Sequence, residues 1–203
     1  MSIDRSFFYF FQRERLVAAP WKNGGGSTRE VACWPRGAGL DNFDWRVSIA
    51  SIAQSGPFSV FEGIDRQIML LDGDGVRLRS SDGRIDHRLG TPNEPFAFSG
   101  DEAIDCTLLG GSSNDFNVMT RRGRCRAELR VVHGGSAIAA MPPCRQGLLY
   151  ALQGRWTLAQ GEAIDAGEGI WWGDKRQGWQ LVSQDDSARL LAVRFFTDSE
   201  SDT

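Results

Sequence analysis

Short apolar runs separated by turn residues alternate along the whole chain. Gly, Asp and Asn turn signals recur about every eight to twelve residues, a spacing typical of an all-β sandwich or barrel. No window keeps a 3.6-residue period, so we expect little helix. The runs rich in Val, Ile, Leu, Phe and Trp predict strands at Phe43–Ser51, Gln67–Leu71, Gly75–Arg79, Glu94–Phe98, Ala103–Leu109, Leu148–Leu152, Arg155–Ala159, Gly169–Trp172 and Arg189–Phe196.

Part of this pattern occurs twice. The same spacing relates Arg66, Gln67, Leu70, Gly75, Ile85 and Asp86 to Arg145, Gln146, Leu149, Gly154, Ile164 and Asp165, and Glu94–Asp101 matches Gly167–Asp174 after a gap. Two hairpins can be alike by chance, but the constant spacing favours a duplicated β unit. We therefore predict an all-β bicupin, two cupin-like (jelly-roll) barrels packed in one chain, with residues 1–120 in the first and 121–203 in the second.

The segment W-K-N-G-G-G-S-T-R-E-V, from Trp21 to Val31, predicts a tight exposed bend that leads into a strand. Three glycines permit positive φ angles, and Asn23 tolerates them as well. Such a bend beside Thr28 and Glu30 is either one wall of a small-ligand site or an ordinary hairpin.

Strand alternation divides the next run into two faces. Trp45, Val47 and Ile49 share one face, whereas Arg46 and Ser48 lie on the other. If that second face and the polar residues after the bend line the same barrel interior, they form a donor-rich pocket. An arginine in such a pocket binds a carboxylate through paired hydrogen bonds. The alternative is that both are solvent-exposed faces of half-buried strands.

Two further polar pairs leave a similar choice. Asp65 and Arg66 either cap a turn through a local salt bridge, or Arg66 enters the pocket and anchors an anion. Asp115 and Asn117, in D-F-N, either form an Asx turn that links the repeated units or present a polar edge to the cavity at their junction.

Composition narrows the function classes. The 203 residues carry a formal net charge of -3, which argues against nucleic-acid binding. The arginines between Arg121 and Arg126 fit a solvated strand edge or loop. Four widely spaced cysteines predict buried, reduced thiols in a cytosolic protein. The apolar patch Phe7–Phe11 lacks the flanks of a signal peptide, and no stretch is long enough to span a membrane. We expect a cytoplasmic protein without membrane contact, and edge strands make a homodimer possible.

Metal and cofactor chemistry is not indicated by the sequence. The two histidines, His87 and His133, have no second His or Cys at ligand spacing. They fit a solvated strand residue and a turn residue, respectively. The chain has no G-x-S-x-G elbow, and its glycine-rich bend matches no phosphate-binding fingerprint. We therefore expect no metal, no cofactor and no catalytic residue.

The ordered motifs W-K-N-G-G-G-S-T-R-E-V, W-R-V-S-I-A, G-P-F-S-V-F-E-G-I-D-R-Q-I-M-L-L-D-G-D-G, F-S-G-D and D-F-N-V-M resemble the HutD/Ves family. These are bacterial cupin-fold proteins associated with histidine utilisation. The match runs from about Trp21 to Met119; after Arg121 it is one of pattern only.

This resemblance implies a metal-free bicupin with a non-enzymatic, regulatory role in histidine catabolism. The implied ligand is a small anionic metabolite, urocanate or formylglutamate. The family motifs mark as candidate ligand-binding residues Trp21, Asn23, Thr28, Glu30, Arg46, Ser48, Arg66, Asp115 and Asn117.

Two other functions remain open. One is a small-molecule isomerase or hydrolase that uses Glu30 and Asp115 as acid–base groups. The other is docking of a partner protein through the Trp171–Trp172 pair or the arginine patch. Of two adjacent strand tryptophans, we expect one ring in the core and one on the surface.

Overall fold

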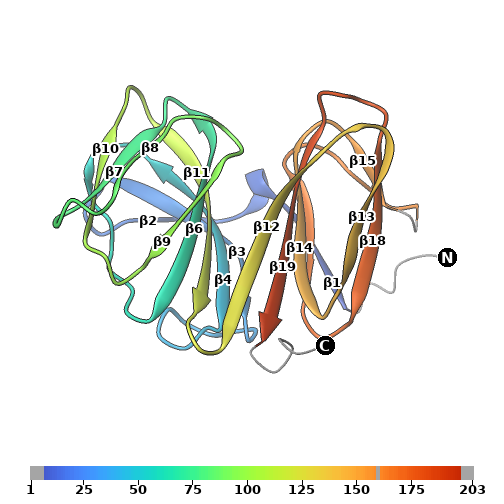
Figure 1. Cartoon of the computed structure of the whole chain (residues 1–203), viewed down its shortest axis with the longest axis horizontal. Helices are drawn as coiled ribbons and strands as arrows, with labels where there is room; N and C mark the ends of the chain where they lie inside the picture. Colours follow the sequence, from blue (N-terminus) through green and yellow to red (C-terminus); the bar gives the residue numbers. More distant parts are fainter. Residues whose placement is uncertain (1–6, 159–160, 198–203) are drawn as a thin grey trace. The chain divides into compact units, whose positions relative to one another are not determined.

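The computed structural model describes residues 7–158 and 161–197 of the chain. It forms two compact units (Figure 1). The first barrel is Val17–Cys125, and the described residues of the second barrel come from Met1–Leu16 and Arg126–Thr203. In the described part of the chain, the only helical element is the 3-10 turn η1 (Arg13–Arg15). The predicted all-β class is confirmed.

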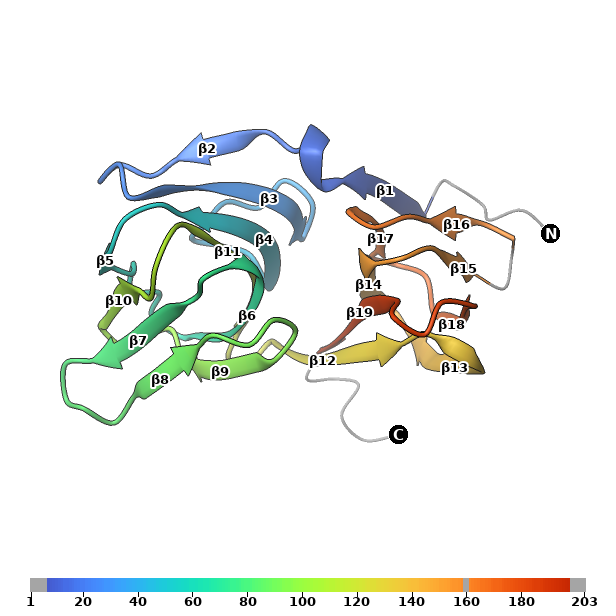
Figure 2. The same cartoon turned by 90° about the horizontal axis from the view of Figure 1, so that it is seen from above.

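The first barrel consists of two antiparallel sheets that face each other (Figure 2). The larger sheet has the order β2-β3-β4-β11-β6-β9 and the smaller one β5-β10-β7-β8. Their core lies between them and includes Ile68 and Leu70 from the larger sheet with Leu78 and Ile104 from the smaller. The strands are β2 (Ala18–Pro20), β3 (Gly26–Trp34), β4 (Trp45–Ile52), β5 (Gly56–Pro57), β6 (Ile64–Gly73), β7 (Val76–Ser80), β8 (Asp86–Leu89), β9 (Pro95–Ser99), β10 (Ile104–Leu108) and β11 (Ser113–Arg121).

The second barrel also has two sheets, with the orders β1-β17-β14-β19-β12 and β13-β18-β15-β16. Its core is built around three buried tryptophans, Trp156, Trp172 and Trp179. The strands are β1 (Phe8–Gln12), β12 (Cys125–His133), β13 (Gly135–Cys144), β14 (Gln146–Gln153), β15 (Trp156–Leu158), β16 (Ala163–Ile164), β17 (Glu168–Trp172), β18 (Gln177–Ser183) and β19 (Arg189–Thr197).

The strand orders confirm the duplicated unit. The series β4-β11-β6-β9 and β5-β10-β7-β8 recurs as β12-β19-β14-β17 and β13-β18-β15-β16. The predicted constant register holds along β6 and β14 but not beyond them. Val76 and Leu78 are buried in β7, whereas Trp156 and Leu158 are buried in β15, so the spacing there is one residue longer.

The unit boundaries differ from the expected 1–120 and 121–203. Strand β1 pairs with β17, so the N-terminal segment belongs to the second barrel rather than the first. The reason is its apolar face, because Phe8 is buried in the core of that barrel. Asp115 and Asn117 lie in the middle of β11 and form neither an Asx turn nor a junction between the repeats. The interpretation of that motif as an Asx turn is therefore wrong, as is its position at a junction.

Candidate functional site

The inner face of the larger sheet of the first barrel carries most of the predicted polar residues. Residues directly opposite each other on antiparallel strands share a face, so the register defines three rows across this sheet. Read from β3 through β4, β11 and β6 to β9, the rows are Thr28, Ala50, Asp115 and Leu70; then Glu30, Ser48, Asn117, Ile68 and Phe96; then Cys33, Arg46, Met119, Arg66 and Phe98. Since Ile68 and Leu70 pack between the two sheets, all three rows face the barrel interior.

Seven of the nine predicted ligand-binding residues are in these rows, and the other two lie at the glycine-rich bend. Trp21 donates a hydrogen bond from Nε1 to Oγ1 of Thr28, at 2.8 Å. Asn23 accepts one from the backbone N–H of Gly25 at 3.0 Å, so it shapes the turn. Gly26 is required for close approach, because a Cβ there would collide with the carbonyl oxygen of Ser51 and touch the Trp21 ring. The bend is thus a hairpin and a border of the interior at once.

Arg66 is buried in the barrel interior and Asp65 pairs with Arg122 instead, so the interpretation of Asp65 and Arg66 as a local salt bridge is wrong. Arg66 is only 8% exposed. The guanidinium carbon lies 4.9 Å from the ring centroid of Phe98, 5.3 Å from that of Phe58 and 5.6 Å from that of Phe61. Among the described residues, its hydrogen bonds go to one acceptor, Oδ1 of Asn117, at 3.3 and 3.4 Å.

Burial lowers the pKa of Arg66 to about 10, with Asp115 acting against this shift and Arg46 adding to it. The guanidinium remains charged at neutral pH and keeps unused N–H donors, because only two of its five bond Asn117. A buried cation with spare donors is suited to hold an anion.

Asp115 is the second buried charge-bearing group of this interior and is 2% exposed. In the described structure its Oδ2 has no hydrogen-bond partner. Burial raises the pKa of Asp115 to about 7, and the nearby positive charge of Arg66 offsets part of that rise.

Arg46 and Glu30 form an ion pair at the side of this group. Nε of Arg46 lies 2.8 Å from Oε2 of Glu30, and the two side chains are 12% and 51% exposed, respectively. Glu30 is therefore half in solvent and already bonded, unlike Asp115. Ser48, in the neighbouring position on β4, is buried.

The first barrel has a hollow of about 180 Å³, which neither Arg66 nor Asp115 lines. Its walls include Trp21, Asn23 and Phe58, together with Cys106. Phe58 also packs on Arg66, and Trp21 bonds Thr28 of the Asp115 row, so the hollow borders the polar interior through these two rings. Burial raises the pKa of the Cys106 thiol to about 12, which makes it a neutral wall group rather than a nucleophile.

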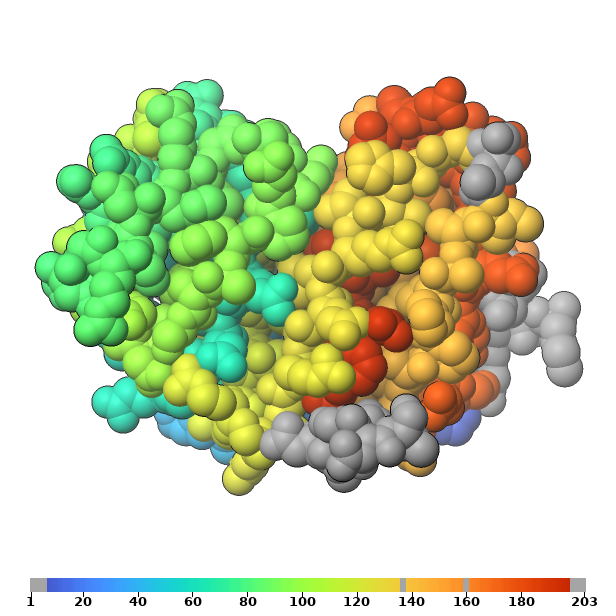
Figure 3. Space-filling model, in the orientation of Figure 1, coloured from blue at the N-terminus to red at the C-terminus, as the bar shows by residue number. Residues whose placement is uncertain are grey.

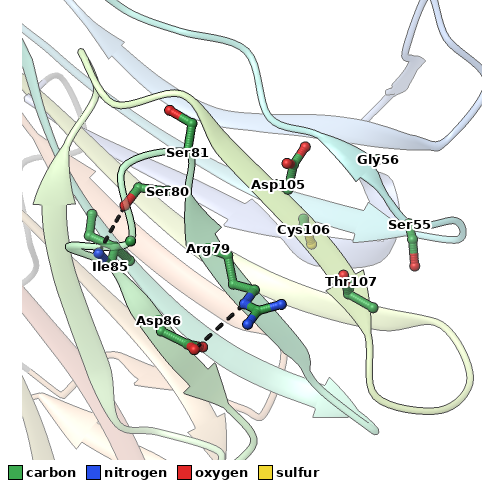
Figure 4. Close-up of a pocket in the computed structure, with 11 residues that line it drawn as sticks. Ser55, Gly56, Arg79, Ser80, Ser81, Ile85, Asp86, Asp105, Cys106 and Thr107 are labelled. Atoms are coloured by element: carbon green, nitrogen blue, oxygen red, sulfur yellow. Dashed lines mark hydrogen bonds and ion pairs between the residues drawn. The ribbon is translucent and has the colours of Figure 1, made fainter.

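A larger hollow of about 690 Å³ lies on the smaller sheet (Figure 4). Arg79 and Asp105 line it from the exposed side of β7 and β10, and Arg79 is 3.5 Å from Asp86. These charged side chains are solvated, whereas the polar groups of the interior are buried. In the space-filling view of Figure 3, segments β7 to β9 form most of the visible face of the first barrel. We therefore place the candidate site in the interior and not in this surface hollow.

Several other predicted features take different places. Asp65 pairs with Arg122, at 2.7 Å, and not with its neighbour Arg66. His87 is a residue of strand β8, as predicted, but it is only partly exposed, and its ring is stacked on Phe96 with centroids 3.8 Å apart.

The tryptophan pair of the second barrel also differs from its prediction. Trp171 and Trp172 are both buried, so neither ring offers a surface for docking. Within the arginine patch, Arg124 pairs with Asp44 and Arg126 with Glu128.

Three phenylalanine rings pack around the Arg66 guanidinium, and none of them was among the predicted site residues. Phe58 and Phe61 come from the irregular segment between β5 and β6, and Phe98 from β9. The signal was present in the G-P-F-S and F-E-G motifs that immediately precede the arginine. Which of their apolar side chains turns inward depends on the loop path, and periodicity does not reveal it.

Residues 7–158 and 161–197 contain neither a cluster of metal ligands nor a membrane-spanning helix. No group of three or more His, Cys, Asp or Glu side chains in the described ranges is placed to hold a metal ion. Nor does that part of the chain contain a helix long and apolar enough to cross a membrane.

Comparison with known proteins gives the family. A model described as HutD matches residues 13–191 of this chain. The chain belongs to the HutD family. Protein Ves of Cronobacter sakazakii is 38% identical over 187 residues, which cover 92% of this chain and 98% of that relative. The HutD resemblance thus extends well beyond Met119, through most of the second barrel.

Solved structures agree with the HutD assignment. A conserved protein of unknown function from Pseudomonas aeruginosa is 34% identical, with a TM-score of 0.82 over 93% of this chain and 98% of that one. HutD from Pseudomonas fluorescens is 28% identical, with a TM-score of 0.80 over 94% and 98%. Oxalate decarboxylase of Lactobacillus farciminis has a TM-score of 0.64 at 9% identity over 93% and 88%, which shows a shared cupin fold alone.

Proposed function

We propose that this protein binds a small carboxylate metabolite at Arg66 inside the first barrel, without a metal and without catalysis. The observation that carries the proposal is the unsatisfied guanidinium. Arg66 is buried, charged and bonded only to Asn117 among the described residues. A carboxylate supplies two acceptor oxygens that fit the planar fork of an arginine.

The surroundings of Arg66 support an anionic ligand. The charge of Arg46 lowers the pKa of Arg66, so two guanidinium groups repel each other across this interior. A bound anion relieves that repulsion. The neighbouring hollow of about 180 Å³ is smaller than the pockets that hold drug-sized molecules, which favours a small metabolite.

We further propose that the bound metabolite regulates histidine utilisation, with urocanate and N-formylglutamate as candidate ligands. Membership of the HutD family supports this role. The geometry supports the carboxylate and not a particular molecule, because both candidates carry that group.

Calorimetry with urocanate, N-formylglutamate and histidine tests the proposal. At least one of them is expected to give saturable heat, and Arg66→Ala is expected to weaken its binding by about 2–5 kcal/mol, the loss for a buried charge-paired contact. Arg66→Lys should recover little, since lysine lacks the fork. Arg145→Ala is the matched control, because Arg145 is the exposed residue that the repeat relates to Arg66. Absence of both saturable heat and a thermal shift with all three compounds would overturn the ligand class.

A second candidate function, acid–base catalysis, is favoured by one observation. The pKa of Asp115 is raised to about 7, which suits a group that gives and takes a proton near neutral pH. NMR analysis of the same three compounds after incubation with the protein checks for a product. A product that forms with the wild-type protein and not with Asp115→Asn would replace the binding proposal by an enzymatic one.

A further inference from the structure

Asp115 occupies a position that packing alone does not explain. It lies in the middle of β11, and its cross-strand neighbours on the inner face are Ala50 on β4 and Leu70 on β6. Neither neighbour has a side-chain hydrogen bond to offer. In the described structure Oδ2 has no hydrogen-bond partner, and burying a polar group without one is unfavourable. An apolar residue would fill this place at lower cost.

The position of Asp115 relative to Arg66 is suited to reading the far end of a ligand. Asn117 bonds Arg66 and lies two residues along the same strand from Asp115, on the same face. Two residues of a strand span about 7 Å. A molecule whose carboxylate rests on Arg66 beside Asn117 therefore has its other end near Oδ2 of Asp115.

We propose that Asp115 is a specificity-determining residue, and that the ligand joins a carboxylate, held by Arg66, to an N–H donor, held by Oδ2 of Asp115. This inference rests on the proposed function of the same site. An ionised carboxylate only accepts hydrogen bonds, so an N–H of an amide or an azole ring satisfies it. A ligand with an ether or ester oxygen at that place leaves Oδ2 unpaired and adds a repulsive lone pair. A site that is built to make a particular hydrogen bond strongly rejects an analogue that lacks the bonding group.

The charges around Asp115 make this preference depend on pH. The charged or titratable groups facing it are Arg66 on β6 and Cys106 on β10. The thiol stays neutral, because burial and the Asp115 charge raise the pKa of Cys106 to about 12. An N–H donor stabilises the ionised form of Asp115, whose pKa is raised to about 7 by burial. The preference for an N–H ligand should therefore grow as the pH rises through about 7.

Two matched pairs of probes test the inference by calorimetry on the full chain. N-formylglutamate is compared with 2-formyloxyglutarate, in which an ester oxygen replaces the N–H. Urocanate is compared with 3-(furan-3-yl)acrylate, in which a furan replaces the imidazole. In at least one pair the N–H member is expected to bind the wild-type protein about 10- to 100-fold more tightly at pH 8, as expected for a hydrogen bond to a charged group. For the first pair, neither member titrates near neutral pH, and the ratio should fall at pH 5.5.

Two variants assign the preference to Asp115. Asp115→Leu should abolish the ratio within each pair, whereas Leu70→Met, a volume-conserving change in the same row, should keep it. Circular dichroism and thermal unfolding check that both variants are folded. The affinity ratio of the wild-type protein tests the inference even if a variant does not fold.

Each remaining outcome contradicts the inference. Equal affinities within both pairs, or a preference that survives Asp115→Leu, overturn it and leave carboxylate binding at Arg66 intact. If no member of either pair binds, the proposed function fails, and the inference fails with it.

Discussion

The two barrels have the same strand order but different interiors. Asp115 pairs with Leu70 in the first barrel, and Ala192 pairs with Leu149 at the related place in the second. Two residues away on the same strands, Ile68 of the first barrel corresponds to Gly147 of the second. A Cβ at Gly147 would collide with the indole of Trp172, so the glycine makes room for that ring.

From these differences between corresponding residues, we expect the interior of the second barrel to contribute mainly to stability and that of the first barrel to ligand binding. In the second barrel Trp172 and Trp179 pack with Phe8, and the ring centroids of the two tryptophans are 5.6 Å apart. Large buried rings add much apolar contact. The first barrel instead buries Arg66 and Asp115, and buried charges without full partners reduce stability. A functional site often carries such a cost, which the rest of the protein offsets.

The register also corrects one part of the predicted repeat. The sequence match aligned Phe96 with Gly169. In the structure, Phe96 lies opposite Ile68 on the neighbouring strand. Gly147 corresponds to Ile68, and the residue opposite Gly147 is Trp172. Trp172 therefore occupies the place of Phe96. The shift of three residues reverses the faces of β17 and places Trp172 in the core, whereas Trp171 on the opposite face stacks on Tyr9.

The largest expected effect comes from emptying the interior of the second barrel. Trp172→Ala removes a fully buried indole and should lower the free energy of unfolding by about 3–5 kcal/mol, measured by urea denaturation. Carboxylate binding, measured at a temperature where the variant is folded, should be unchanged. A loss of stability below about 1 kcal/mol, or lost binding by the folded variant, would contradict this division between the barrels.

An intermediate effect is expected from Asp115 and depends on pH. The pKa of this carboxyl is raised to about 7 in the folded protein, whereas an unfolded chain releases the proton near pH 3.9. Between these values only the folded state keeps the proton, so stability falls as the pH rises and levels off above about 7. The total loss from this group is up to about 4 kcal/mol.

Asp115→Asn should remove that component of the pH dependence. Urea denaturation at pH 5 and pH 8 measures the free energy of unfolding of the wild-type protein and of the variant. Relative to the wild-type protein, the variant should be most stabilised at pH 8. If both proteins change by the same amount between the two pH values, Asp115 is not buried as an unpartnered acid.

Much of the fold was predictable because strands leave a strong local signal. All nine predicted strands overlap observed ones, and Arg189–Phe196 falls within β19 (Arg189–Thr197). Strand β11 was missed because its polar residues alternate inward, so Asp115 and Asn117 resemble a turn sequence. Strand β1 was assigned to the wrong barrel because its partner β17 is far away in the chain.

The site was predictable to a smaller extent. Strand alternation grouped Arg46 with Ser48, and the family motifs marked Arg66, Asp115 and Asn117, which the residue pattern had already offered as alternatives to turn residues. The register places all five on one face. Neither source could show that Oδ2 of Asp115 is unpartnered or that Glu30 is bonded to Arg46. Those facts depend on side-chain geometry across four strands. The role of these residues in binding stays a prediction.

The smallest expected effect concerns the surface of the first barrel. Asp65 neighbours Arg66 in sequence but points outward, where it pairs with Arg122 at 2.7 Å; both side chains are about half exposed. Such pairs contribute about 0–1 kcal/mol, because water already solvates both charges. Asp65→Asn should therefore change the urea unfolding free energy by less than about 1 kcal/mol and leave carboxylate affinity unaltered. The neighbouring Arg66→Ala serves as the contrasting variant. If Asp65→Asn weakened binding as much as Arg66→Ala, the ligand would be held at the surface, and the buried interior would not be what distinguishes the first barrel from the second.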